Sequence, residues 1–304
     1  MAERLGTDTG ELRRFMLERH PVRGYWIRLD AAWRELRRHQ RYTPSVETLL
    51  GEAVTASVLL AATLKFHGTL TLQLAGDGLV SLLVAQCTHD FAVRAVAREA
   101  GAVVGTPGFR ELVGAGRLSV TIEADERATR YQGIVALEAT HLAGCLENYF
   151  ATSEQLPTRI ALSADGQRTA GVLLQKLPVS NAQGEALGAM SQDAWETLQV
   201  RVAALEQPLL QLGTAEEVLQ RVCAEHDCRL FGGTPVRFAC RCSSARVDNV
   251  LRSLGAEELR GIVAEQGAVT VTCEFCGRPY RLDAIDVERL FAIGASPEAP
   301  QSLN

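Results

Sequence analysis

Apolar and polar residues recur with two different periods along the first part of the chain, up to Pro178. From Val46 onward apolar residues fall at helical spacing, and Ser45 can cap a helix, so residues 46–64 are predicted to be helical. The most apolar stretch of this segment, residues 53–64, is well short of the roughly 20 residues that cross a bilayer. We therefore predict a buried core helix and no membrane contact.

The strand-like segments of the same region are short and come in neighbouring pairs. Leu70, Leu72 and Leu74 alternate with polar residues, and residues 76–78 (Gly-Asp-Gly) lead into the apolar run 79–85, which is typical of a β-hairpin. Residues 118–122 and 134–138 predict a second pair, followed by a helix over 141–152 and strands up to 177. Because strands and helices do not alternate regularly, we predict an α+β fold, with a large mixed core domain of antiparallel sheets over residues 1–178.

The composition changes after Pro178. Residues 179–192 are small, polar and glycine-containing, which indicates a linker. Two helices are predicted next, one after a Ser191 cap and one beginning with the capping-box pair Thr214 and Glu217. A break is predicted at residues 232–235 (Gly-Gly-Thr-Pro), so residues 179–235 are assigned to a helical linker and 236–304 to a small C-terminal domain. The apolar stripe of the linker helices contains Trp195, Leu198, Val202, Leu205, Leu209, Leu210 and Leu212.

Composition and charge narrow the class of protein. The 304 residues are 47% hydrophobic, which is enough to fill a substantial core. A formal net charge of −5 argues against a general nucleic-acid binder, which normally shows a basic field. The opening residues 1–20 carry charges throughout and lack the apolar run of a secretory signal, so a cytoplasmic location is predicted. Because that compartment keeps thiols reduced, the eight cysteines indicate metal ligands or redox thiols rather than a disulfide framework.

Four of these cysteines fall as two close pairs. Cys240 and Cys242 are followed, after thirty intervening residues, by Cys273 and Cys276. Zinc takes four ligands tetrahedrally, and each close pair can offer two sulfurs to one ion. We therefore predict one structural Zn²⁺ on these four residues, in a closed site with no position for a catalytic water. The alternative of unrelated buried thiols does not account for two tight pairs.

Energetics predict what this domain does when its metal leaves. A module of about sixty residues has a core that rarely supplies more than roughly 3 to 5 kcal/mol. Structural zinc contributes apparent binding energies of roughly 10 to 16 kcal/mol in small peptides, so metal loss should unfold the module. Thiolates are also the oxidisable form of cysteine, so peroxide could convert the ligands to disulfides and eject the ion.

These residues resemble the bacterial redox-regulated 33-kilodalton heat-shock chaperone family, over nearly the whole chain. The pairs stand in the contexts Phe238-Ala-Cys-Arg-Cys-Ser243 and Val271-Thr-Cys-Glu-Phe-Cys-Gly277, which are similar to the zinc motif of that family. The amino-terminal region agrees at several further stretches. These are Leu49-Leu-Gly-Glu52, Leu64-Lys-Phe-His-Gly68, Gln73-Leu-Ala-Gly-Asp-Gly78, Tyr149-Phe150, Ser153-Glu-Gln155 and Gln175-Lys-Leu-Pro178.

The resemblance implies a non-enzymatic, ATP-independent holdase chaperone of the oxidative stress response, with a substrate-binding core, a helical linker and a zinc-binding redox-switch domain. It implies that oxidation converts the four thiolates to two disulfides, releases zinc and unfolds the zinc domain and linker. The unfolded region then holds unfolding client proteins, and the active form is a homodimer. Sequence neighbours would pair as Cys240–Cys242 and Cys273–Cys276, although a bridge across one intervening residue is strained. In the resting state the apolar linker stripe should lie against the core.

Two other functions compete with this interpretation. The Cys273-x-x-Cys276 pair could be the dithiol of a thiol-disulfide oxidoreductase, but such a motif normally opens a helix after a strand, without a second competing pair.

A nucleic-acid-binding zinc ribbon is the other alternative. Residues 236–295 contain eight arginines and eight acidic residues, so four thiolates on one dication leave a net charge of about −2, which makes a poor phosphate binder.

Cys223 and Cys228 depart from the family pattern. They add a Cys-x-x-x-x-Cys pair, with His226 between them, at the end of the second predicted linker helix. One interpretation places Cys223 in the apolar stripe of that helix and Cys228 at its end. The other lets one or both join oxidative disulfides, which would tie the linker to the switch.

Overall fold

The computed structural model describes residues 10–101, 105–124, 130–178, 190 and 192–292. The chain divides into two compact units, Met1–Ala239 and Cys240–Asn304, and each is described by itself. The predicted linker stretch over residues 179–192 and the Ser191 cap lie almost entirely outside the described residues.

The first unit is built on one large sheet. In the described residues its strand order is β7-β6-β3-β4-β5-β10-β1-β2-β9-β8, and every neighbouring pair is antiparallel except β5 and β10. This confirms the predicted α+β class. The strands are β1 (Gly10–Leu17), β2 (Val22–Leu29), β3 (Gly68–Ala75), β4 (Val80–Thr88), β5 (Ala92–Glu99), β6 (Arg117–Ala124), β7 (Arg130–Ala136), β8 (Thr158–Ala164), β9 (Thr169–Lys176) and β10 (Cys228–Phe238).

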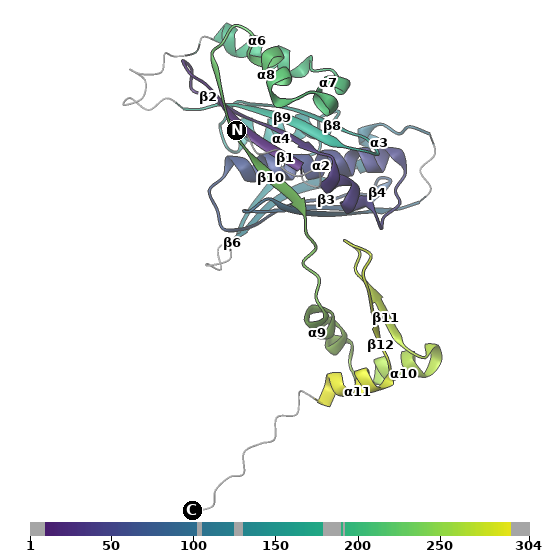
Figure 1. The fold of residues 1–304 in the computed structure, drawn as a ribbon. Helices are drawn as coiled ribbons and strands as arrows, with labels where there is room; N and C mark the ends of the chain where they lie inside the picture. Colours follow the sequence, from purple (N-terminus) through teal and green to yellow (C-terminus); the bar gives the residue numbers. More distant parts are fainter. Residues whose placement is uncertain (1–9, 102–104, 125–129, 179–189, 191, 293–304) are drawn as a thin grey trace, which may run out of the picture. The chain divides into compact units, whose positions relative to one another are not determined.

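The helix α2 (Pro44–Thr63) is the centre of the main core. It packs against β3, β4 and β5 from one half of the sheet and against β2, β8 and β9 from the other, so the sheet curls around it (Figure 1). α2 is long and apolar enough to cross a membrane, but 78% of its apolar window is buried inside the fold. The predicted buried helix is confirmed, and it begins two residues early because Pro44 suits a first helical turn.

The other regular elements of this region follow the sequence pattern. The predicted hairpin is β3 and β4, the second predicted pair is β6 and β7, and the predicted helix over 141–152 is α4 (Leu142–Thr152). His141 caps α4, since its Nδ1 accepts a hydrogen bond from the Gly144 amide at 2.8 Å. Two short helices, α1 (Ala31–Arg37) and α3 (Phe109–Val113), complete the main core.

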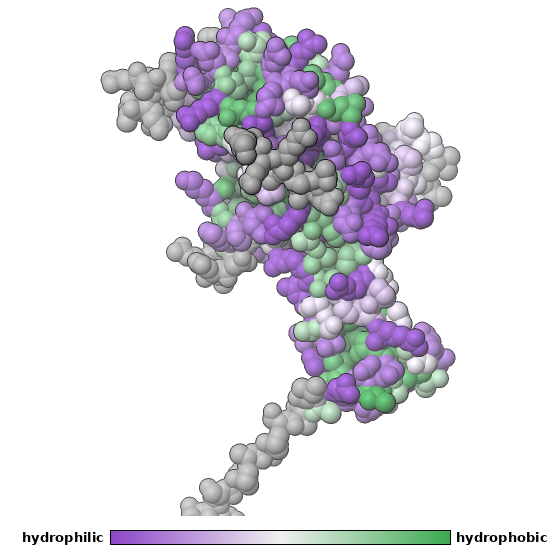
Figure 2. All heavy atoms as spheres, viewed as in Figure 1, coloured by the Kyte–Doolittle hydropathy of each residue, from purple (hydrophilic) through white to green (hydrophobic). Residues whose placement is uncertain are grey.

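Three helices form a second layer on the outer face of β1, β2 and β9, and we call them the α6–α8 layer. They are α6 (Gln192–Ala203), α7 (Gln207–Leu212) and α8 (Ala215–Cys223). Alternate residues of β2 face opposite ways: Ile27 packs in the main core, and Trp26 packs under the layer. In Figure 2, hydrophilic residues predominate on the visible outside of this layer.

The apolar stripe predicted for the linker helices does lie against the sheet. Trp195, Leu198 and Val202 are buried, and so is Leu210 of α7, whereas Leu212 is exposed. The predicted capping box of α8 is also present: the Glu217 amide donates to Thr214 Oγ1 at 3.2 Å, and the Thr214 amide donates to Glu217 Oε2 at 2.8 Å. A second apolar cluster, distinct from the main core, joins this layer to Phe15, Trp26, Val172 and Leu174.

The largest difference from the sequence-based expectation is β10. Residues 232–235, interpreted as a break, lie inside this strand, which pairs with β1 along its length and with β5 at Arg237 and Phe238. The register between β1 and β10 shifts between Arg13 and Phe15, so β10 carries one extra residue there. Glycine tolerates such a bulge, and Pro235 lies where β10 has a partner on one side only.

The second unit is small. It contains α9 (Ser244–Leu254), α10 (Ala256–Gln266), the hairpin strands β11 (Val269–Thr272) and β12 (Pro279–Leu282), and α11 (Ala284–Ala292). Gly255, with a φ of 92°, separates α9 from α10. The buried core of the described residues consists of Leu251, Leu259, Val269, Leu282, Val287 and Leu290.

Candidate metal centre

Two separate segments of the second unit present the four predicted cysteines. Cys240 and Cys242 precede α9, whose N-cap Ser243 accepts a hydrogen bond from the Arg246 amide at 3.3 Å. Cys273 and Cys276 lie in the turn between β11 and β12. Each pair therefore stands beside a regular element that fixes the direction of its backbone.

The turn that carries Cys273 and Cys276 is closed by backbone hydrogen bonds. The Gly277 amide donates to the Cys273 carbonyl at 2.8 Å, and the Cys273 amide donates to the Arg278 carbonyl at 2.9 Å. Gly277 has a φ of 67°, a conformation that glycine adopts without steric cost. This tight turn carries both thiols between the two strands of the hairpin.

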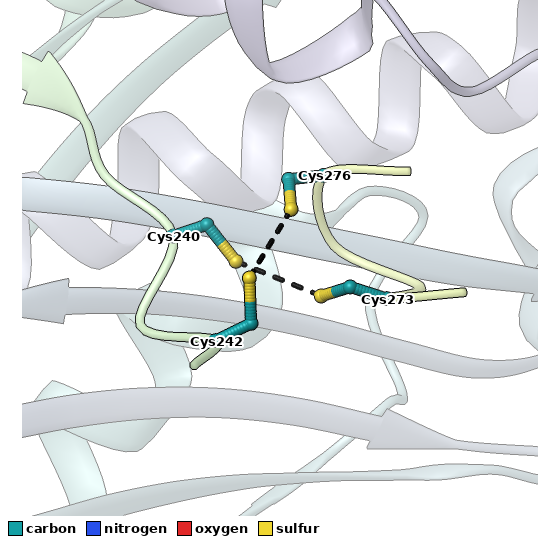
Figure 3. Close-up of side chains that lie close together, drawn as sticks. All are labelled: Cys240, Cys242, Cys273 and Cys276. Atoms are coloured by element: carbon teal, nitrogen blue, oxygen red, sulfur yellow. Dashed lines mark hydrogen bonds between the residues drawn. The ribbon is translucent and has the colours of Figure 1, made fainter. Parts of the chain in front are cut away.

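The four sulfurs converge. Figure 3 shows the side chains pointing toward one another from the two segments. The Sγ atoms of Cys240 and Cys273 are 3.7 Å apart, those of Cys242 and Cys276 are 3.5 Å apart, and all four lie within 4.8 Å of one another. Among the described residues, this is the one group of three or more His, Cys, Asp or Glu side chains with ligand atoms so close together.

This arrangement fits a tetrahedral metal ion. Zinc–sulfur bonds of about 2.3 Å place tetrahedral sulfurs about 3.8 Å apart, close to the two short separations here. All four cysteines are free thiols, and each is partly buried. Four soft sulfur donors with that spacing suit Zn²⁺, and they suit hard oxygen-preferring cations poorly.

The thiols differ in acidity. Burial raises the pKa of Cys276 to about 12, and burial likewise raises the pKa of Cys240. Burial also acts to raise the pKa of Cys242, but the neighbouring Tyr280 hydroxyl and the other thiols outweigh it, so that this pKa falls to about 7. Cys242 is poised to ionise at neutral pH, whereas Cys240 and Cys276 need a neighbouring cation to become thiolates.

Tyr280 is a neighbour of the site that sequence reasoning missed. It lies on β12, opposite Val271 of β11, and its hydroxyl acts on the Cys242 thiol. A single tyrosine after the second cysteine pair gives no pattern that would identify it. The structure reveals Tyr280 because the pairing of β11 with β12 places this residue beside Cys242 of the first cysteine pair.

The geometry also bears on the dithiol-enzyme alternative. A catalytic Cys-x-x-Cys motif normally stands at the start of a helix, where the helix dipole lowers a thiol pKa. Here Cys273 and Cys276 lie in a hairpin turn, and each approaches a thiol of the other pair. This arrangement favours a ligand set over a free dithiol. The pairings Cys240–Cys242 and Cys273–Cys276 concern the oxidised protein and stay predictions.

The remaining cysteines lie in the first unit, apart from this site. Cys87 and Cys145 are fully buried in the main core. Cys223 ends α8 and is 3% exposed, and Cys228 begins β10 and is partly exposed. The expectation that Cys223 belongs to the apolar face of its helix is confirmed, but the placement of Cys228 at the end of that helix is wrong, because the helix ends at Cys223 and Cys228 begins a strand.

Fold and site together define a two-unit α+β protein with a four-thiol, metal-type cluster in its smaller unit. A family model described as Hsp33 protein matches residues 10–283. The 33 kDa chaperonin of Shewanella woodyi is 41% identical, over 95% of this chain and 98% of that protein. That of Pseudomonas paraeruginosa is also 41% identical, over 97% and 99%. The chain belongs to the Hsp33 family.

A solved structure agrees at the level of the fold. The crystal structure of the 33 kDa chaperonin, a heat shock protein 33 homolog, from Thermotoga maritima matches with a TM-score of 0.80. The match covers 94% of this chain and 99% of that one, at 23% sequence identity. The family resemblance given by the sequence motifs is thereby confirmed, and the names of the curated relatives support a chaperone function.

Proposed function

We propose that this chain is an ATP-independent holding chaperone of the cytoplasm, controlled by a zinc-thiolate switch in its second unit. The observation that carries the proposal is the convergence of four thiols in a unit with a very small apolar core. When bound, Zn²⁺ would supply the charge that keeps Cys240, Cys242, Cys273 and Cys276 as thiolates and would tie the two cysteine segments together.

The folding of the second unit depends on the bound metal because its own apolar core is small. An apolar cluster of six buried side chains among the described residues is small for a unit that begins at Cys240. Modules of this size have cores worth roughly 3 to 5 kcal/mol, less than the roughly 10 to 16 kcal/mol of a structural zinc site. Loss of the ligand set therefore unfolds the unit.

Oxidation is the proposed trigger. Each pair of thiolates gives two electrons to one molecule of hydrogen peroxide, which takes up two protons from the solvent and leaves as two waters while a sulfur–sulfur bond forms. We propose the pairings Cys240–Cys242 and Cys273–Cys276, between neighbours in sequence. Disulfide sulfurs are poor ligands, so the site no longer holds a metal.

The client-binding surface is proposed to come from the α6–α8 layer. Its inner face, with Trp195, Leu198 and Val218, covers apolar side chains of the sheet such as Phe15 and Trp26. Undocking of the layer would expose both faces to partly unfolded proteins. The chain connects the switch to this layer through β10, which ends two residues before Cys240 and packs on α8. We further propose that the active, oxidised form is a homodimer.

The test is suppression of light scattering by a heat-unfolding client protein, without ATP. The chain is added either reduced and zinc-loaded or after peroxide treatment at a temperature that permits unfolding. Suppression by the oxidised form alone is expected. Failure of both forms would contradict the chaperone function, and equal success of both would contradict the switch.

A further inference from the structure

The connection between α8 and β10 brings two thiols together outside the proposed metal site. Cys223 is the last residue of α8, and Cys228 is the first residue of β10, where it pairs with Leu17 of β1. The two thiols are neighbours, close enough that each shifts the pKa of the other. Both belong to the apolar cluster under the α6–α8 layer, Cys223 as a buried member and Cys228 as a partly buried one.

The backbone holds the chain in the turn that makes this approach possible. Ala224 follows α8 with a φ of 37°, a value that residues with a side chain rarely adopt, and its amide donates to the Gln220 carbonyl at 3.2 Å. The His226 amide donates to the Cys223 carbonyl at 2.8 Å. On the far side of the turn, the Glu18 amide donates to the Asp227 carbonyl at 2.9 Å, which anchors the turn to the end of β1.

The two thiols have complementary properties for oxidation. The neighbouring Cys223 thiol lowers the pKa of Cys228, which is also the more exposed of the two. The Cys228 thiol, together with burial, raises the pKa of Cys223. A partly exposed thiol of lowered pKa beside a buried thiol is the usual arrangement of an attacking and a resolving cysteine.

We propose that Cys223 and Cys228 are a second site of oxidative modification and form a disulfide with hydrogen peroxide as oxidant. The Cys228 thiolate attacks one peroxide oxygen, the oxygen–oxygen bond breaks, and Cys228 becomes a sulfenic acid while hydroxide leaves. The Cys223 sulfur then attacks the Cys228 sulfur, and water leaves with the oxygen and the Cys223 proton. Overall two thiols and one peroxide give one disulfide and two waters.

This disulfide limits how much of the α6–α8 layer undocks when the metal site is oxidised and loses zinc. The bridge encloses a very short loop, so it adds little to global stability. It does fasten the last turn of α8 to the strand that joins the two halves of the sheet. The disulfide itself stands without the proposed function; its effect on the release of the α6–α8 layer rests on that function. In the oxidised chain, α8 stays attached at Cys223, and any undocking of the layer starts from α6 and α7.

Peptide mapping tests the disulfide directly in the full chain. Trypsin cuts after Arg221 and Arg229, so both thiols fall on the single peptide 222–229, whereas Arg241 separates Cys240 from Cys242. The reduced chain is treated with hydrogen peroxide, quenched, alkylated in denaturant and digested. The expected result is a peptide 222–229 that lacks the alkyl groups and is lighter by two hydrogen atoms than the dithiol peptide.

Zinc release, followed with a coloured chelator in the same samples, separates this inference from the proposed switch. A bridged peptide without zinc release would support the inference and contradict the switch. Zinc release with Cys223 and Cys228 both alkylated would overturn the inference and leave the switch standing. A peptide 222–229 cross-linked to another cysteine would overturn it as well.

Hydrogen exchange gives a second measurement with a matched variant. In oxidised chain, amides of the last turn of α8 are expected to keep their protection, whereas Cys228→Ser should lose it, because Cys223 then has no partner. Cys145→Ser, which removes a buried thiol of the main core, should behave as the unchanged chain at α8. Equal protection of α8 in the oxidised unchanged chain and in Cys228→Ser would overturn the proposed fastening.

Discussion

The two units of this chain are stabilised by different means. In the first unit a curled sheet surrounds α2, and the outer face of β1, β2 and β9 is covered by a helical layer, so many large side chains such as Trp26, Trp33 and Leu59 are inaccessible to solvent. In the second unit a short hairpin and three helices bury few apolar side chains beside four thiols. The first unit is therefore stabilised by its apolar core, whereas the second unit depends on its four metal-binding thiols.

Removal of the metal should unfold the second unit and leave the first unit folded, which is the largest difference that we expect between them. A strong zinc chelator, or the Cys242→Ser variant, is expected to abolish amide protection throughout α9, α10 and the β11–β12 hairpin. The reason is the loss of roughly 10 to 16 kcal/mol against a core of roughly 3 to 5 kcal/mol. Hydrogen exchange read by mass spectrometry checks this, with α2 as the internal control. Retained protection in the second unit would mean that its core suffices.

A matched pair of leucines sharpens the comparison. Leu59 in α2 and Leu259 in α10 are both 0% exposed, and truncation of such a residue to alanine costs roughly 2 to 5 kcal/mol. Because folding and metal binding are coupled in the second unit, Leu259→Ala is expected to raise the zinc Kd by roughly 30-fold or more. Leu59→Ala should lower the melting temperature of the first unit and leave that Kd unchanged.

Competition with a chelator of known affinity measures the zinc Kd for both variants. The decisive result is that each substitution changes only one property: Leu259→Ala changes the zinc Kd, and Leu59→Ala changes the melting temperature of the first unit. A Leu259→Ala chain with unchanged zinc affinity would show that the site forms in a unit whose fold does not depend on it.

The smallest expected effect concerns the α6–α8 layer within the first unit. Thr214→Ala removes the side-chain oxygen that accepts from the Glu217 amide, which costs about 1 kcal/mol of helix stability. α8 amides should then exchange several-fold faster, and the half-maximal peroxide dose for client protection should fall. Thr152→Ala, at the end of α4 and outside the layer, is the control and should change neither. An unchanged α8 would mean that apolar burial alone holds it in place.

The sequence predicted most of the fold where the periods are regular. α2, the β3–β4 hairpin and α8 with its capping box follow from residues that repeat at fixed spacing or occupy fixed cap positions. β1 went unrecognised because both of its faces are buried, Leu12 in the main core and Phe15 and Leu17 under the α6–α8 layer, so apolar and polar residues do not alternate along it. β10 was missed because the glycines that accommodate its bulge are the residues that usually mark a break.

The site was predictable as a residue set but not as a geometry. Four thiols in two tight pairs identify the ligands, since few other structures require that spacing. The cross-pairing of Cys240 with Cys273 and of Cys242 with Cys276, and the presence of Tyr280, depend on the hairpin register. The close approach of Cys223 and Cys228 likewise depends on the turn at Ala224, which no sequence pattern predicts.

The place of β10 in the sheet also governs when the protein can fold during its synthesis. β1 leaves the ribosome first among the strands, but its partner on one side consists of residues 228–236, near the other end of the chain. Until those residues emerge, the two halves of the sheet remain unjoined and both present open strand edges, which are prone to aggregate. The cysteine-bearing unit follows at once. The nascent chain of this chaperone is therefore itself an incompletely folded protein for most of its translation.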